Sequence, residues 1–192
     1  HYNSAPSIIP VKFYDKDMKA KYLETNTDFV NNLEEDISTD QKIAVVYSKN
    51  KDLSNTLSLD KQNTTHVNHF TQLYNYLDGV IDNSDGLSFF IKISSESFEI
   101  IIFNKNEFVF FNTFEIVDEN EFLYYTFFVL KNFQRSIKKD KIIFIGRHEI
   151  FNKYYSLASK YSSIKFIEDD THSILNFKEK FFSVINAHNI RD

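Results

Sequence analysis

Two groups of side chains have the residue types of a metal site. His66 and His69 are three residues apart, and Asp169-Asp170 is followed by His172. Histidine nitrogens and carboxylate oxygens are common ligands of divalent metal ions. The histidine pair has no third ligand nearby, and the acidic group is typical of a loop with solvated charges. We therefore predict no metal site in this protein.

The chain has no nucleophile motif and no familiar phosphate-binding motif. It contains no cysteine and no serine, histidine and aspartate in the order of a catalytic triad. It also contains no P-loop and no glycine motif of a dinucleotide-binding fold. Gly146 and Arg147 stand between a predicted buried strand and a predicted helix, where Arg147 would face a phosphate or a base. A tight turn with a solvated arginine is the simpler explanation. Asn112 lies near the end of another predicted strand, either as a cleft residue or as a turn former. Asn112, Gly146 and Arg147 are the candidate nucleotide-binding residues.

The elements that would position these residues are most regular between residues 87 and 146. Three predicted strands are followed by an apolar helix and a buried strand, at Leu87–Ile93, Phe98–Phe103, Phe108–Phe114, Asp118–Ile137 and Lys141–Ile145. Asp118 and Glu121 form a capping-box pattern, and two apolar stripes on the helix predict packing on two sides. A helix, a strand and a final helix follow at Glu149–Tyr161, Ile164–Ile167 and Phe177–Ala187. Two hairpins, a helix and a strand are the start of a ribonuclease-H-like half-domain, and actin-like ATPases contain two such halves.

The first part of the chain is less regular. Lys42–Tyr47 is apolar on both faces and predicts a central strand, while Phe70–Ile81 has the i, i+3, i+4 spacing of a helix. Asp28–Asp40 is acidic and predicts a loop or irregular helix. The other expected elements are a strand at Ser7–Ile9, a helix at Asp15–Leu23 and a short strand at Thr64–Val67.

The order of elements in residues 42–82 resembles that in residues 141–187. Only one strand is expected before the first helix, so the first half is either missing two strands upstream of residue 1 or genuinely shorter. The turn cluster at Asp82–Gly86 predicts the boundary. We expect an α/β protein with mixed sheets flanked by helices, divided into an incomplete first ribonuclease-H-like half at residues 1–83 and a second at residues 84–192.

Short motifs in a matching order resemble an uncharacterised bacterial family. In the first half they are Ile9-Pro10, Phe13-Tyr14-Asp15, Tyr22-Leu23 and Asn26, and in the second half Asn112-Thr113-Phe114, Asp118–Glu121, Tyr124-Tyr125 and Ile145-Gly146. The family, best known from Bacteroidetes, has no known function, and its resemblance spans residues 8–170. It implies an actin-like ATPase fold and members that extend further upstream. Thr113 replaces the usual serine.

The predicted turn at Ser94–Ser97 argues against ATP hydrolysis. Active actin-like ATPases hold phosphates with glycine-rich turns, whose backbone N–H groups approach the anion, and with an acidic residue for Mg²⁺. This turn has no glycine, and Glu96 would repel phosphate. We therefore expect a catalytically inactive pseudo-ATPase without a cofactor, since the motifs do not support ATP and Mg²⁺.

Such a protein would act as a scaffold or regulator for an unknown protein partner. The alternative is an ATP-dependent kinase or ATPase whose catalytic loops lie upstream of residue 1. A ribonuclease-H-type nuclease ranks last, because the strand ends lack the carboxylates that two metal ions need.

The composition of the chain argues against nucleic acid and membrane as partners and against secretion. The 192 residues have a net charge of -5, which argues against nucleic-acid binding. No apolar run approaches the roughly 20 residues that span a bilayer, and no secretory signal is visible. We therefore expect a cytoplasmic bacterial protein that binds neither nucleic acid nor membrane. The sequence leaves its oligomeric state open.

Overall fold

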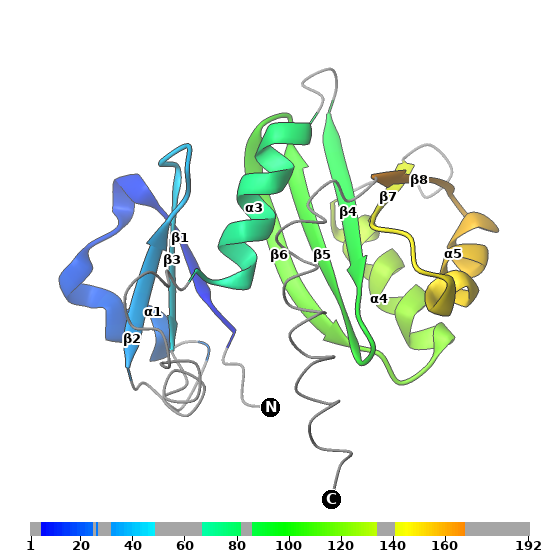
Figure 1. The fold of residues 1–192 in the computed structure, drawn as a ribbon, viewed down its shortest axis with the longest axis horizontal. Coiled ribbons are helices and arrows are strands. Elements are labelled where there is room, and N and C mark those ends of the chain that lie inside the picture. The colour runs from blue at the N-terminus through cyan, green and yellow to red at the C-terminus, as the bar shows by residue number, and fades with distance from the viewer. Residues whose placement is uncertain are drawn as a thin grey trace, which may run out of the picture. The chain divides into compact units, whose positions relative to one another are not determined.

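The chain forms two compact units, His1–Val80 and Ile81–Asp192 (Figure 1). The computed structural model describes residues 5–24, 26, 32–48, 67–81, 86–133 and 141–167. The predicted boundary between residues 83 and 84 lies outside these ranges, as does the predicted final helix at residues 177–187. Within the described ranges, no helix is long and apolar enough to cross a membrane.

The first unit contains a three-stranded antiparallel sheet in the order β1-β3-β2. Its strands are β1 (Ser7–Pro10), β2 (Leu33–Ile37) and β3 (Ile43–Ser48), and its helices are η1 (Val11–Phe13), η2 (Lys16–Met18), α1 (Lys19–Glu24) and α3 (His69–Val80). The predicted central strand and long helix are confirmed as β3 and α3. Most of the predicted strand at residues 64–67 is outside the described residues, and Val67 is not in a strand.

The prediction of a loop or irregular helix at residues 28–40 was wrong for β2. Its sequence, Leu-Glu-Glu-Asp-Ile, has few strand-forming residues, but β3 supplies a full ladder of backbone partners. β3 is itself buried along its first five positions. Pairing with a buried apolar strand overrides a weak local preference, because strand propensity depends strongly on what the strand packs against.

The second unit has a five-stranded mixed sheet in the order β6-β5-β4-β7-β8. Its strands are β4 (Leu87–Ile93), β5 (Ser97–Asn104), β6 (Glu107–Glu115), β7 (Lys141–Ile145) and β8 (Ser163–Ile167), and its helices are α4 (Glu119–Asn132), η3 (Glu149–Phe151) and α5 (Asn152–Ser159). β4, β5 and β6 form antiparallel hairpins, and β4, β7 and β8 are parallel. This is the predicted arrangement of a ribonuclease-H-like half.

The core of the second unit lies between one face of this sheet and the helices α4 and α5. Alternate residues of β4 and β5 point into it, as expected from the period of two in a strand. Phe98 of β5 contacts Phe122 of α4 with ring centroids 4.9 Å apart, and Phe122 contacts Tyr154 of α5 at 5.2 Å. These ring contacts fasten both helices to the same face of the sheet.

Helix α4 begins as predicted. The Asp118 side chain accepts hydrogen bonds from the backbone N–H groups of Asn120 (2.7 Å) and Glu121 (2.9 Å). Both predicted apolar stripes pack against the core of the unit, where Phe122, Val129 and Leu130 are buried and Leu123, Tyr125, Phe127 and Phe133 are partly buried. Tyr124 and Phe128 belong to neither stripe and are 62% and 49% exposed. The fully buried positions of α4 lie on one side only, at Phe122, Thr126, Val129 and Leu130.

The β5–β6 turn contains a lysine in the left-handed conformation, Lys105, with φ of 57°. Its backbone N–H donates to the carbonyl of Gly86 at 2.9 Å. This long-range hydrogen bond holds the lysine in a conformation that asparagine adopts more readily.

Candidate functional site

The candidate site lies at the carboxyl ends of the parallel strands of the second unit. β4 pairs with β7 so that Ile91 is opposite Phe144. Continuing this register brings the β4–β5 turn beside Gly146 and Arg147, which follow β7. In open α/β sheets this edge is where ligands usually bind. The sheet therefore places the β4–β5 turn, Ser94–Ser97, next to the predicted glycine–arginine junction.

Gly146 is required by the local backbone. Its φ is +74°, in the left-handed region that favours glycine and that other residues rarely adopt. Its backbone N–H donates to the carbonyl of Ile167, the last residue of β8, at 3.1 Å. Gly146 therefore turns the chain out of the sheet, and its N–H group is already used by a neighbouring strand.

Arg147 is exposed and lies against β8. Its guanidinium carbon is 5.0 Å from the centre of the Phe166 ring, within the range of a cation–π contact. The next residue, His148, donates its backbone N–H weakly to the Tyr155 hydroxyl, at 3.4 Å. Burial raises the pKa of Tyr155, so this phenol stays neutral. The loop is held by α5 and β8, and it presents a single cation.

Asn112 is not part of this arrangement. It is exposed on β6, opposite Ile100 of β5, and β6 is separated from β7 by β5 and β4. Neighbouring strands are about 4.8 Å apart, so Asn112 lies roughly 14 Å from β7 along the sheet. The side chains on either side of Asn112 on the same face, Phe110 and Phe114, contact Phe133 and Tyr125 of α4.

The β4–β5 turn uses its own backbone groups. The N–H of Ser94 donates to the Ser97 carbonyl at 2.8 Å, and the Glu96 carbonyl accepts from the N–H of Ile116 at 2.9 Å. Ser94, Ser95 and Glu96 are all exposed. The turn therefore presents a carboxylate to the solvent at the place where an anion would need donors.

The histidines and aspartates that were considered and rejected as metal ligands lie largely outside the described ranges. His66, Asp169, Asp170 and His172 are not described, and His69 is the first residue of α3. Among the described residues, no group of three or more histidine, aspartate or glutamate side chains could hold a metal ion.

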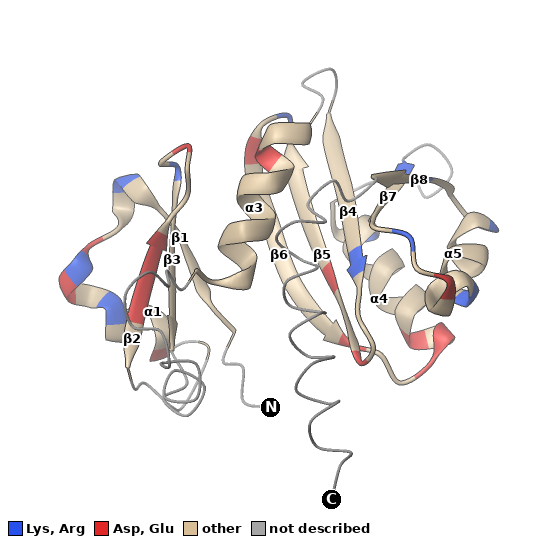
Figure 2. Cartoon of the chain, in the orientation of Figure 1, with Lys and Arg blue, Asp and Glu red and all other residues tan. Residues whose placement is uncertain are grey.

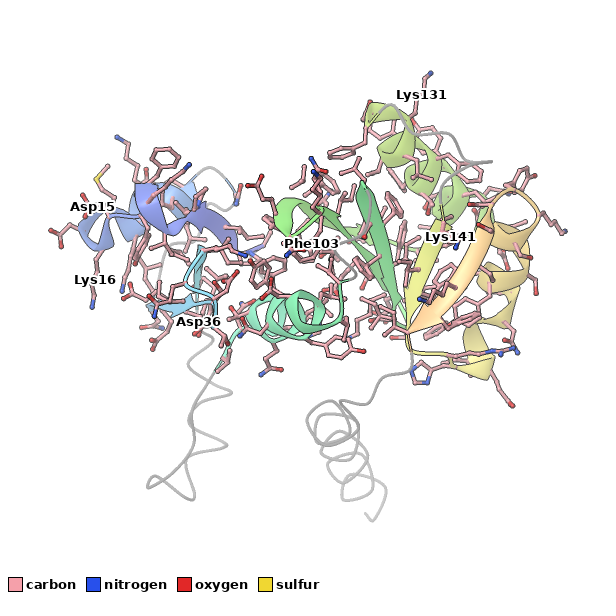
Figure 3. The ribbon with its side chains drawn as sticks, turned by 90° about the horizontal axis from the view of Figure 1, so that it is seen from above. Asp15, Lys16, Asp36, Phe103, Lys131 and Lys141 are labelled. Carbon is pink, nitrogen blue, oxygen red and sulfur yellow. The ribbon has the colours of Figure 1, made fainter. Side chains whose placement is uncertain are left out.

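The structure also reveals three carboxylates of the first unit that hold its elements together. Asp36 accepts from the Asn68 N–H (2.6 Å) and the Thr71 hydroxyl (3.0 Å) at the start of α3, and from the Tyr47 hydroxyl (3.2 Å). From the sequence, Asp36 lay in an acidic segment that predicted a loop or irregular helix. Instead, Asp36 connects β2 to α3 (Figure 3).

Glu35 and Asp40 are the other two. Glu35 accepts from the Tyr14 hydroxyl and pairs with Lys19 and, at 3.4 Å, with Lys16. Burial and the hydrogen bond to Glu35 raise the pKa of Tyr14. Asp40 accepts from Ser38, Lys42 and Tyr74. No pattern in the sequence pairs these acids with tyrosines so far along the chain.

The first-half residues behind the family resemblance have structural partners. The Tyr22 hydroxyl accepts from the Asp15 N–H at 3.0 Å and donates to the Phe13 carbonyl at 3.2 Å. The Asn26 amide donates to the Ser7 hydroxyl at 2.9 Å, and Ser7 donates to the Tyr22 carbonyl at 2.6 Å. These bonds fasten η2 and α1 to β1.

The family described as Protein of unknown function (DUF3822) matches residues 1–164. The chain belongs to this family. A solved structure from Bacteroides thetaiotaomicron, described as a protein with an actin-like ATPase fold and unknown function, is similar to this DUF3822 chain with a TM-score of 0.74. The two sequences are 13% identical, and the match covers 85% of this chain and 65% of the other. No curated protein matches the DUF3822 chain.

These comparisons confirm the predicted resemblance to a family of unknown function with an actin-like ATPase fold. At 13% identity the structural likeness shows the fold alone. The DUF3822 chain spans 65% of the length of the solved structure. An activity for the DUF3822 chain therefore depends on the residues of its own candidate site.

Proposed function

We propose that this protein acts by binding another protein, as a scaffold or regulator, and does not hydrolyse ATP. The β4–β5 turn is the observation that carries the proposal. In an actin-like ATPase this turn has to bring backbone N–H groups close to a phosphate. Here it is Ser94-Ser95-Glu96-Ser97, with no glycine to allow close approach and with an exposed carboxylate.

The hydrogen bonds of the turn support the same conclusion. The Ser94 N–H is used within the turn, and the Gly146 N–H beside it is used by β8. An ATP phosphate would have to displace these bonds and also lie near the charge of Glu96. Like charges a few ångströms apart repel each other, most strongly where water is excluded.

Arg147 is the candidate side chain for binding a phosphate at this site. Its contact with Phe166 stabilises it on β8 rather than over the β4–β5 turn. One exposed arginine attracts anions only weakly, because solvent and salt screen its charge. Nucleotide binding through Asn112, Gly146 and Arg147 is therefore the weaker hypothesis.

The predicted cytoplasmic, bacterial location stays a prediction, which cell fractionation would test.

The test is a thermal-shift titration of the full-length protein with ATP, ADP and Mg²⁺, together with an assay of ATP turnover. A nucleotide at 100 times its dissociation constant would stabilise the protein by about 2.7 kcal/mol. We expect no shift and no turnover.

The Arg147→Ala variant shows whether any activity belongs to this site. Its matched control is Lys165→Ala, which removes an exposed positive charge from β8. ATP turnover that Arg147→Ala abolishes and Lys165→Ala leaves intact would overturn the proposal, and the alternative of an ATP-dependent kinase or ATPase would replace it.

A further inference from the structure

We propose that two copies of this chain associate through helix α4, with the two helices antiparallel and related by a two-fold axis. The contact surface is the α4 seam, which consists of Glu121, Tyr124, Phe128 and Lys131. This inference rests on the surface of the second unit and is independent of whether nucleotide binds.

The α4 seam is a continuous stripe on the solvent side of the helix. Its residues are spaced by three, four and three positions, which is the a/d spacing of helices that pack against each other. At 3.6 residues per turn, these positions lie opposite the buried Phe122, Thr126 and Val129. The seam therefore points away from the core of its own unit.

The centre of the seam is aromatic. Tyr124 is 62% exposed and Phe128 is 49% exposed, and their rings stack with centroids 6.1 Å apart and planes 18° apart. These two adjacent aromatic side chains expose apolar surface to water on the outside of the helix. Burying such side chains against another protein is favourable, and aromatic residues are enriched at interfaces for this reason.

The charges of the seam are complementary to themselves. Acidic residues gather at the start of α4 (Figure 2), and Lys131 lies near its end, pointing away from the helix (Figure 3). Glu121 and Lys131 are both five residues from Thr126, and Tyr124 and Phe128 are both two residues from it. A two-fold axis that crosses the α4 seam at the level of Thr126 along the helix therefore places Glu121 opposite the partner's Lys131. The same axis places Tyr124 opposite the partner's Phe128.

A hollow beside Glu121 provides room for the lysine of a second copy. It has a volume of about 330 Å³ and is lined by Thr113, Phe114, Glu115, Val117, Glu121 and Tyr125. Two carboxylates and an aromatic ring are suitable contacts for an ammonium group. In the antiparallel arrangement the partner's Lys131 reaches this end of α4, and the same contact recurs at the other end.

This symmetry favours a second copy over an unrelated partner. A closed dimer uses the same patch on both subunits, so every feature of the patch has to match itself. The α4 seam meets this condition for both of its charges and both of its rings. One helix pair is a small interface, so we expect reversible association with a micromolar dissociation constant.

Sedimentation equilibrium of the full chain over a range of concentrations tests the proposal. We expect a monomer–dimer equilibrium that Phe128→Ser shifts to monomer, with circular dichroism showing a folded variant. Ile150→Ser is the matched control, because Ile150 is a 75% exposed residue of η3 outside the seam. A chain that stays monomeric up to high micromolar concentration, or a dimer that Phe128→Ser leaves unchanged, would overturn the proposal.

Charge reversal tests the antiparallel register. Glu121→Lys and Lys131→Glu should each weaken self-association about tenfold, because each places like charges opposite each other twice per dimer. The double variant restores the pairs and should recover wild-type association. A mixture of the two single variants should form a heterodimer, since one carries two lysines and the other two glutamates at these positions. Single variants that dimerise as well as wild type, or a double variant that does not recover, would contradict this register.

Discussion

Asp40 shows how one side chain holds the first unit together. Its carboxylate accepts from the Ser38 hydroxyl (2.6 Å), the Lys42 N–H (3.0 Å) and the Tyr74 hydroxyl (2.8 Å), and pairs with the Lys42 ammonium at 3.0 Å. Burial alone would raise its pKa, but these donors outweigh burial and lower the pKa from 3.8 to about 2. The ionised form of Asp40 is therefore the form that the fold stabilises.

This pKa predicts how stability depends on pH. A carboxyl group with a lowered pKa stabilises the folded state above its unfolded pKa, and this contribution is lost as the pH falls towards the folded value. We expect Asp40→Asn to reduce the free energy of unfolding by about 2 kcal/mol at pH 7. The difference from wild type should shrink between pH 4 and pH 2.

Urea unfolding at a series of pH values measures this difference. Asp17→Asn is the matched control, because Asp17 is an exposed aspartate in η2. If Asp40→Asn lost the same stability at pH 2 as at pH 7, the hydrogen bonds of the carboxylate would not be its source.

At the scale of elements, two buried threonines on two helices are expected to affect the free energy of unfolding in opposite directions. Thr126 of α4 is fully buried, and its hydroxyl has no hydrogen-bond partner in the described part of the chain. Thr71 of α3 is 1% exposed, and its hydroxyl donates to Asp36 at 3.0 Å. A buried hydroxyl without a partner costs about 1–3 kcal/mol, whereas one that binds a carboxylate stabilises the fold.

The same change, threonine to valine, should therefore act in opposite directions. Thr126→Val should raise the free energy of unfolding by about 1 kcal/mol, and Thr71→Val should lower it by about 1–3 kcal/mol and weaken the connection between β2 and α3. Chemical denaturation of both variants measures the two changes. A loss of stability in Thr126→Val would show that its hydroxyl has a partner.

At the scale of the whole molecule, self-association would make thermal stability depend on concentration. A dimer is stabilised by mass action, so its unfolding temperature rises with protein concentration, whereas that of a monomer does not. We expect the unfolding temperature to rise between about 1 and 100 times the dissociation constant, and this rise to disappear in Tyr124→Ser. Differential scanning calorimetry at several concentrations measures it. An unfolding temperature that is equally concentration-dependent in Tyr124→Ser would place the dimer contact elsewhere.

The local pattern of the sequence determined most of the second unit. Alternating apolar residues specified the strands from Leu87 to Phe114, and Asp118 specified the start of α4, because both depend on near neighbours in the chain. Gly146 ended β7 as predicted, since few other residues adopt its backbone angles. The actin-like fold followed from the order of these elements, and the structural similarity confirms it.

Only the tertiary structure decided which residues meet. Strand order placed Asn112 three strands from Gly146, and β3 made a strand of the acidic residues at Leu33–Ile37. Asp36 and Thr71 bind each other from 35 positions apart. On α4, packing against the sheet and α5 buried the two predicted apolar stripes and left the aromatic rings of Tyr124 and Phe128 at the surface. Local periodicity specifies an element, but its partners depend on the contacts that the folded chain brings together.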